Sequence, residues 1–361
     1  MKYSTIEDQL QGMFQAYVPL SPAQLRRVVM LCVAVLVAGE VSLTRLARFL
    51  PQQAKQASRM RWIQRLLSAA FLSHERVYAP LLQQALKGYH APIWHVIIDR
   101  TRLEGQPVDL VTISLNYQKR AIPLVWCLVP FGGASNRVYA DLVLQAAPLI
   151  PPGQRVVFHG DTEFGCAVMM RQLRHLGWDF MLGVTSAVHI WPHGAAHSQR
   201  LGSLTLPKSG TLRLTSVDCF QKERVGALNL IAFRDKNHSG GHLRRVTCYL
   251  MTSLPLSAAT KRLGRRRWGT EPYHRDYKSA GWHLNACRLT SPHRLDALLV
   301  ILAVCYLSML VLGRWLSKTG RRREIDSHRR RHLSLFRLGW DCFLHAFRLG
   351  EPIPIPLSLY P

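Results

Sequence analysis

The spacing of apolar residues changes twice along this chain of 361 residues. Over residues 1–90 apolar positions recur at intervals of about three to four residues, which predicts helices. The clearest helix follows Ser21, a typical N-cap before Pro22, and its apolar run ends at Gly39. From Pro92 onward, short apolar runs bounded by turn residues predict strands. After residue 257 the helical spacing returns, so the pattern predicts a helical, an α/β and a second helical region.

The middle region predicts a specific order of elements: three strands, a helix, a strand, a helix and a strand. The strands are expected at residues 93–98, 108–115, 122–129, 156–158 and 178–184, and the helices at 136–149 and 164–176. The first three strands are close enough in sequence to form an antiparallel meander. Further strand-like runs lie at 211–217, 227–233 and 243–251, with a turn expected at 235–240.

A basic segment lies within the helical N-terminal region. Residues 42–50 predict a short helix, and a basic helix is expected around residues 58–67. Its arginines, Arg59, Arg61 and Arg65, span more than one face. A short helix followed by a basic helix is typical of a helix-turn-helix module that contacts DNA phosphates. A helical bundle with a solvated basic face fits the same pattern.

Charge favours the interpretation with nucleic acid. Lys and Arg number 47 against 21 Asp and Glu, for a formal net charge of +26, which indicates a polyanionic partner; anionic membrane is the other candidate. The eight cysteines form no C-x2-C pair, so they are expected to be reduced thiols in a cytosolic protein. Residues 1–18 are polar and mixed, unlike a secretory signal.

One apolar run raises the question of whether the chain crosses a membrane. Residues 298–312 are apolar except for Ser308, but about 15 residues fall short of the roughly 20 that span a bilayer. A buried core helix is therefore predicted. A basic membrane-surface protein that uses this run as an anchor is the rival hypothesis.

The candidate chemistry rests on three carboxylates. Asp99 and Asp161 each follow an apolar strand-like run, so each is expected at a sheet edge. Glu271 lies in a segment that predicts a helix, where Arg267 four residues earlier and Lys278 seven residues later share its face. Three carboxylates suit two hard divalent cations that assist phosphoryl transfer. Taken singly, each is as typical of a strand end, a helix cap or a solvated ion pair.

Together these residues resemble the DDE transposases of bacterial insertion sequences. The matching stretches are Asp99, the Gly-Asp-Thr-Glu-Phe-Gly of residues 160–165, and Arg-Trp-x2-Glu-x6-Lys-Ser-x-Gly at 267–281. They follow the branch with the signature Y-x2-R-x3-E-x6-K. The signature tyrosine would fall at Gly264, where this chain departs from the pattern. The resemblance implies an α/β fold: an RNase H-like mixed sheet flanked by helices, with a helical N-terminal region and a β-rich insertion before the catalytic glutamate.

The resemblance also implies the roles of individual residues. Asp99, Asp161 and Glu271 would be catalytic and would hold two Mg²⁺ ions, for which Mn²⁺ can substitute. The residues expected to contact DNA are Arg267, Trp268, Arg275 and Lys278. Arginine suits bidentate phosphate contact and lysine acts as a point charge. Trp268 has two interpretations, a core residue or a platform on which an unpaired base stacks.

The implied organisation and activity follow from the same resemblance. The expected regions are 1–90, helical and DNA-binding; 91–186 and 258–316, the two parts of the catalytic domain; 187–257, the β-rich insertion; and 317–361, a basic C-terminal region. The expected activity is metal-dependent cleavage at the element's ends and 3′-OH strand transfer into target DNA. A homodimer in the end complex, a cytoplasmic, nucleoid-associated location and no membrane are expected. A catalytically impaired DNA-binding regulator is the alternative that Gly264 supports.

Overall fold

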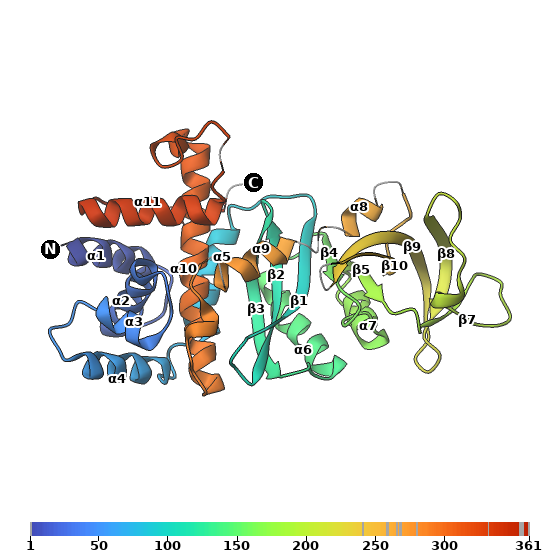
Figure 1. Ribbon diagram of the computed structural model, residues 1–361, viewed down its shortest axis with the longest axis horizontal. Helices are drawn as coiled ribbons and strands as arrows, with labels where there is room; N and C mark the ends of the chain where they lie inside the picture. Colours follow the sequence, from blue (N-terminus) through green and yellow to red (C-terminus); the bar gives the residue numbers. More distant parts are fainter. Residues whose placement is uncertain are drawn as a thin grey trace. The chain divides into compact units, whose positions relative to one another are not determined.

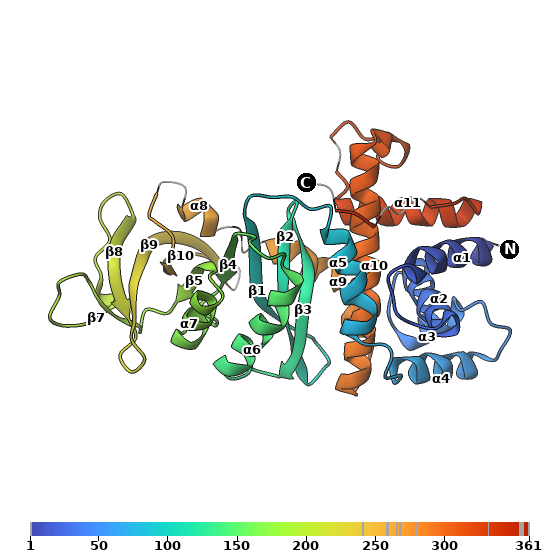
Figure 2. The same cartoon turned by 180° about the vertical axis from the view of Figure 1, so that it is seen from behind.

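The computed structural model describes residues 2–239, 242–257, 260–264, 266, 269–278, 281–330, 332–353 and 357–359 (Figure 1). The chain forms two compact units. The helical unit consists of Met1–Ala91, Arg102–Asp109 and His274–Pro361, and the sheet unit of Pro92–Thr101 and Leu110–Tyr273. Figure 2 shows the same elements from behind.

The helical unit is built mainly from α-helices, with one π-helical turn. They are α1 (Lys2–Gln15), α2 (Pro22–Ala38), α3 (Leu43–Arg48), α4 (Gln56–Leu67), α5 (Ala79–Leu86), α10 (Pro292–Lys318), α11 (Leu335–Leu349) and the π-helical turn His74–Tyr78. The predicted boundaries of α2 are confirmed. The Ser21 hydroxyl accepts a hydrogen bond from Gln24 N at 3.3 Å while the Gln24 side chain accepts one from Ser21 N, and Gly39 ends the helix with φ of 65°.

The core of the helical unit is the long helix α10. It packs against α2 and α11. Glycines allow the close approach to α11: a Cβ at Gly339 would lie 1.9 Å from Met309 O, and one at Gly313 would lie 1.9 Å from Leu335 O. Among the described residues α10 is the helix whose length and composition would allow it to cross a membrane, yet 94% of its apolar window is buried inside the protein. Burial on this scale supports the prediction of a core helix.

The sheet unit is organised around ten strands. They are β1 (Trp94–Arg102), β2 (Val108–Tyr117), β3 (Arg120–Pro130), β4 (Val156–Gly160), β5 (Asp179–Val184), β6 (His189–Trp191), β7 (Gln199–Arg200), β8 (Thr211–Cys219), β9 (Val225–Ser239) and β10 (His242–Thr252). The helices of this part are α6 (Asn136–Ala146), α7 (Ala167–His175) and α8 (Thr260–Gly264), and α9 (Thr270–Tyr277) leads into the helical unit. Helix α6 packs against β3 and α7 against β5.

All ten strands form one mixed sheet in the order β3-β2-β1-β4-β5-β10-β9-β8-β6-β7. β4 pairs in parallel with β1 and β5, and β10 pairs antiparallel with β5. The predicted fold class, an RNase H-like mixed sheet flanked by helices, is confirmed. The turn predicted at residues 235–240 is wrong for most of its length, because β9 continues to Ser239 in register with β10.

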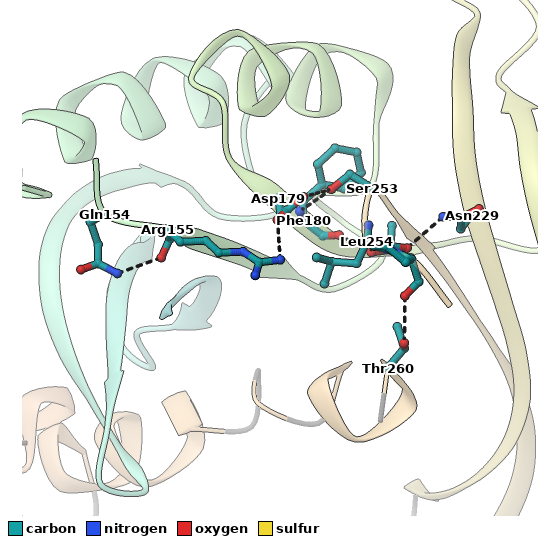
Figure 3. A network of polar contacts seen from close by, with 10 residues as sticks. Gln154, Arg155, Asp179, Phe180, Asn229, Ser253, Leu254 and Thr260 are labelled. Carbon is teal, nitrogen blue, oxygen red and sulfur yellow. Dashed lines mark hydrogen bonds and ion pairs between the residues drawn. The ribbon is translucent and has the colours of Figure 1, made fainter. Parts of the chain in front are cut away.

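A polar network joins the strands of the β-rich region to the central sheet (Figure 3). The Asp179 carboxylate of β5 accepts hydrogen bonds from Ser253 Oγ at 3.0 Å and from the Arg155 guanidinium at 3.4 Å. Asn229 Nδ2 of β9 donates to Leu254 O at 2.8 Å. Beside this network, Thr260 Oγ1 donates to Pro255 O at 3.2 Å, so the start of α8 is fixed to the end of the β-rich region.

Candidate active site

The two predicted aspartates lie on neighbouring strands or directly after them: β1 continues past Asp99 to Arg102, and Asp161 follows the last residue of β4. β1 and β4 run parallel with Ile97 opposite His159, and Asp99 and Asp161 each lie two residues beyond this pair. Side chains two apart in a strand share a face, and the contact of 3.0 Å between His95 Nδ1 and His159 Nε2 shows which residues face the same way. Asp99, within β1, and Asp161, just after β4, therefore follow the face of this histidine pair.

Local backbone groups orient both carboxylates. Arg100 N donates to Asp99 Oδ1 at 3.1 Å, and Glu163 N donates to Asp161 Oδ1 at 2.9 Å. The second contact, from residue i+2 back to an aspartate, is the arrangement of an Asx turn. Each carboxylate therefore has a defined direction set by the residues that follow it.

Two glycines allow the turn after Asp161 to lie directly on β5. A Cβ at Gly165 would lie 1.7 Å from Gly183 O, and a Cβ at Gly183 would lie 2.8 Å from Thr162 N. Real Cβ contacts of this length do not occur, so side chains at either position would push the turn away from the strand. The glycine that ends the sequence motif at residues 160–165 is explained by this close approach.

The third carboxylate is delivered by the first turn of α9. Thr270, 2% exposed, donates its hydroxyl to Asp99 Oδ2 at 2.7 Å. Glu271 is the next residue; its side chain is exposed and makes no hydrogen bond or ion pair with another described residue. Pro272 lies in the first turn, where its missing N–H is tolerated. Helix α9 begins at Thr270 and ends at Tyr277; the helix face predicted to be shared by residues 267 and 271 stays a prediction, because Arg267 lies outside the described residues.

The donor set has the chemistry that a hard divalent cation requires. Asp99, Asp161 and Glu271 offer only carboxylate oxygens, the ligands that Mg²⁺ and Mn²⁺ prefer. Within the part of the chain that the structure describes, no three His, Cys, Asp or Glu side chains gather closely enough to hold one ion. The aspartate pair therefore fits such an ion by donor type and by the face that the two side chains share.

A neutral histidine pair lies along the same face. Burial, followed by the positive charge of Arg266, lowers the pKa of His95 to about 4. Burial, followed by His95 and Arg266, lowers the pKa of His159 to about 3. Both imidazoles are therefore neutral at neutral pH and add no positive charge beneath the carboxylates. The sequence analysis missed this pair, although His95 and His159 precede Asp99 and Asp161 at even spacings in their strands.

The predicted DNA-contacting residues have different outcomes. Arg267 and Trp268 lie outside the described residues. Arg275 is exposed on α9. Lys278 follows the end of α9, and its Nζ donates to the carbonyl of Arg102 within the helical unit. Trp282, another aromatic side chain near this segment, is fully buried against Tyr306, Phe336 and Trp340, so it cannot stack on a base.

Gly264, at the position of the signature tyrosine, closes α8 against the sheet. A Cβ at Gly264 would lie 2.8 Å from Leu250 Cδ1 and 3.5 Å from Met181 Cε. Both neighbours belong to an apolar cluster that also contains Val157 and Leu254. The absence of a side chain at Gly264 therefore allows α8 to approach the sheet closely.

The family of the chain is shown by its sequence match to a domain model. The model of the transposase DDE domain matches residues 92–308, more than half of the chain. The chain belongs to this family. Membership makes it a DDE transposase, a class of nuclease and transferase enzymes that act on DNA and generally use divalent metal ions.

The comparisons with curated proteins and with solved structures add little to this family assignment. A search of curated proteins finds no match. Among solved structures the chain is similar to the piggyBac transposase in a synaptic complex with hairpin DNA, with a TM-score of 0.49 and 12% sequence identity over 97% of this chain and 80% of that chain.

Proposed function

We propose that this DDE transposase cleaves DNA at the ends of a bacterial insertion sequence and joins the freed 3′-OH to target DNA. The observation that carries the proposal is the alignment on one face of Asp99 in β1 and Asp161 just after β4, with the Thr270 hydroxyl hydrogen-bonded to Asp99 immediately before Glu271. The spacing of the Arg267, Glu271 and Lys278 signature supports assignment to the Y-R-E-K branch.

The three carboxylates would hold two Mg²⁺ ions, or Mn²⁺ in their place. When bound, such ions lower the pKa of an attacking water or hydroxyl and stabilise charge on the leaving oxygen. Asp99 and Asp161 are oriented for this role by backbone N–H groups. Thr270 anchors the start of α9 to Asp99, and Glu271, the next residue, would supply the third carboxylate.

The helical unit offers a surface for the DNA backbone. A hollow of about 590 Å³ is lined by Arg61 and Arg65 of α4 and by Arg294 of α10. Arg294 Nε donates to Ser68 Oγ at 2.8 Å, and Arg61 and Arg65 form no ion pair with another described residue. Three arginines without a carboxylate among them suit phosphate oxygens. This arrangement supports the proposal that residues 1–90 contact DNA.

The remaining parts of the proposal concern assembly and location. Two element ends must be joined, so a homodimer that holds each end in trans is proposed, as is a cytoplasmic, nucleoid-associated location. A DNA-binding regulator without cleavage activity is the second candidate, and the departure at Gly264 favours it. The DNA cleavage assay described below tests both the transposase and the regulator.

The deciding experiment uses the purified full-length protein and a duplex that carries the element's terminal repeat. Cleavage at the repeat boundary in Mg²⁺, its loss in EDTA and its recovery on addition of Mn²⁺ are expected. Specific binding of the duplex without cleavage in either metal would instead assign the chain to the regulator.

A further inference from the structure

A partly buried polar cluster lies behind the candidate metal site. Arg100 follows Asp99 and Glu163 follows Asp161 by two residues; their side chains meet, with Arg100 Nε 2.7 Å from both Glu163 oxygens. The two side chains are only 27% and 25% exposed. Because successive side chains of a strand point to opposite faces, Arg100 is directed away from the face that carries Asp99. The ion pair therefore links the two strand ends from the side opposite the carboxylates.

Helix α6 completes the cluster. Tyr139 OH donates to Glu163 Oε1 at 2.6 Å and accepts a hydrogen bond from Ala134 N at 2.9 Å. Burial, then the hydrogen bond to Glu163, raises the pKa of Tyr139 to about 12, so the hydroxyl keeps its proton and remains a donor. Glu163 is thus held from two sides, by the Arg100 guanidinium and by the Tyr139 phenol.

The backbone is shaped to admit this cluster. Gly133 adopts φ of 107°, and a Cβ there would lie 2.9 Å from Tyr139 OH and 3.2 Å from Glu163 Oε1. Side chains other than glycine rarely adopt such a φ. The loop after β3 therefore closes over the Tyr139–Glu163 contact at a position where only glycine fits.

The same two residues orient the aspartates through their main chains. Arg100 N donates to Asp99 Oδ1 and Glu163 N to Asp161 Oδ1. A displacement of either side chain would therefore move the N–H group that fixes the direction of a carboxylate. The separation of the two backbone segments decides whether their carboxylates can share a cation, because Mg²⁺ requires oxygen ligands at about 2.0–2.1 Å.

We propose that the Arg100–Glu163 ion pair, supported by Tyr139, is a positioning device that sets the separation and direction of Asp99 and Asp161 for a shared divalent cation. The inference rests on the proposed function only for the identity of the carboxylates as metal ligands. In this proposal Arg100, Tyr139 and Glu163 act through the two aspartates and are not themselves ligands of the cation. Supporting groups of this kind typically change metal affinity by about 10–100-fold when they are removed.

The test is Mn²⁺ binding to the DNA-free, full-length protein, measured by electron paramagnetic resonance of unbound Mn²⁺. Glu163→Gln keeps the shape but removes the charge, and is expected to raise the Kd for Mn²⁺ about tenfold or more. Glu223→Gln is the matched control: it removes the same charge from the exposed Arg171–Glu223 pair of the same unit, and should leave Kd unchanged. Tyr139→Phe leaves the ion pair intact, so a smaller rise of a few-fold is expected.

A double-mutant cycle distinguishes positioning from a general loss of stability. If Arg100→Gln and Glu163→Gln act through the same pair, the double variant should bind Mn²⁺ no more weakly than the worse single variant. Melting temperatures measured in EDTA report the stability of each variant independently of Mn²⁺ binding. If Glu163→Gln folds poorly, the Kd of Tyr139→Phe, the milder variant, tests the proposal instead.

Two results would overturn the proposal: a Kd for Glu163→Gln or Tyr139→Phe equal to that of the wild type, or no Mn²⁺ affinity in the wild-type protein. Failure of the wild-type protein to cleave DNA despite normal Mn²⁺ binding would count against the proposed function alone, and would leave the effect of Glu163→Gln on Kd as the measure of this inference.

Discussion

The hydroxyl of Thr270 is hydrogen-bonded to the carboxylate of Asp99 across 171 positions of sequence, at 2.7 Å. Thr270 begins α9 and is almost fully buried, whereas Glu271 beside it is exposed. This one contact fixes the start of the glutamate helix to β1. Thr270 is therefore the residue that relates the third carboxylate to the first.

Two replacements of Thr270 distinguish the effect of its hydroxyl from the effect of its side-chain shape. Thr270→Val keeps the branched side chain but removes the donor to Asp99, and Thr270→Ser keeps the donor. A lost hydrogen bond to a charged group is worth about 1.5–3 kcal/mol, so Thr270→Val should slow single-turnover cleavage of an end-bearing duplex by one to two orders of magnitude. Thr270→Ser should remain close to wild type. Equal rates for the two variants would show that the hydroxyl has no part in placing the site.

The carboxylates themselves give a sharper prediction. Asp99→Asn, Asp161→Asn and Glu271→Gln each remove a negatively charged ligand from a shared pair of cations. Each should abolish strand cleavage while leaving the affinity for terminal-repeat DNA within a few-fold of wild type, as measured by gel shift. Asp141→Asn, on the exposed face of α6, is the control for loss of an acidic residue. Cleavage by any one of the three variants near the wild-type rate would remove that residue from the proposed site.

The proposed DNA surface on the helical unit predicts a change in salt dependence. For duplex DNA, log K falls by about 0.9 per phosphate contact for each log unit of salt. Arg61→Gln with Arg65→Gln should therefore weaken binding and make this slope shallower by up to about two. Arg137→Gln is the matched control, because Arg137 of α6 is already paired with Asp141 at 3.1 Å. An unchanged slope in the double variant would mean that α4 does not contact the backbone of DNA.

Elements whose signals are local were predictable from the sequence. Ser21, Pro22 and Gly39 carry the caps of α2 within a few residues of each end, and the structure has the same boundaries. The strands that end near Asp99 and Asp161 were predicted because continuous apolar runs bounded by polar residues indicate buried strands. Local chemistry of this kind depends little on the rest of the fold.

Contacts between distant segments could not be predicted in the same way. The pairing of β10 with β5, the Thr270–Asp99 hydrogen bond and the Arg100–Glu163 ion pair depend on how the sheet brings segments together. The i,i+4 spacing of residues 267 and 271 indicates a shared helix face only if a helix covers both. That shared face stays a prediction, because Arg267 lies outside the described residues.

The last prediction concerns the pH dependence of stability. His274 lies on α9 in the helical unit. Burial, followed by the positive charge of Lys278, lowers the pKa of His274 to about 3. The unfolded chain has an ordinary histidine pKa of about 6.5, so between these values the unfolded state binds a proton that the folded state does not. The contribution of His274 is therefore complete above about pH 6.5 and is lost as the pH falls toward 3.

At pH 5 this difference amounts to as much as about 2 kcal/mol in the free energy of unfolding. His274→Gln cannot bind the proton, so its unfolding free energy should fall less than that of the wild type between pH 7 and pH 5. His293→Gln replaces an exposed histidine at the start of α10 in the same unit and should retain the wild-type pH dependence. Urea unfolding at pH 7, 6 and 5 measures all three proteins. Parallel curves for wild type and His274→Gln would mean that His274 is protonated in the folded protein at pH 5, and that α9 does not bury it as the structure describes.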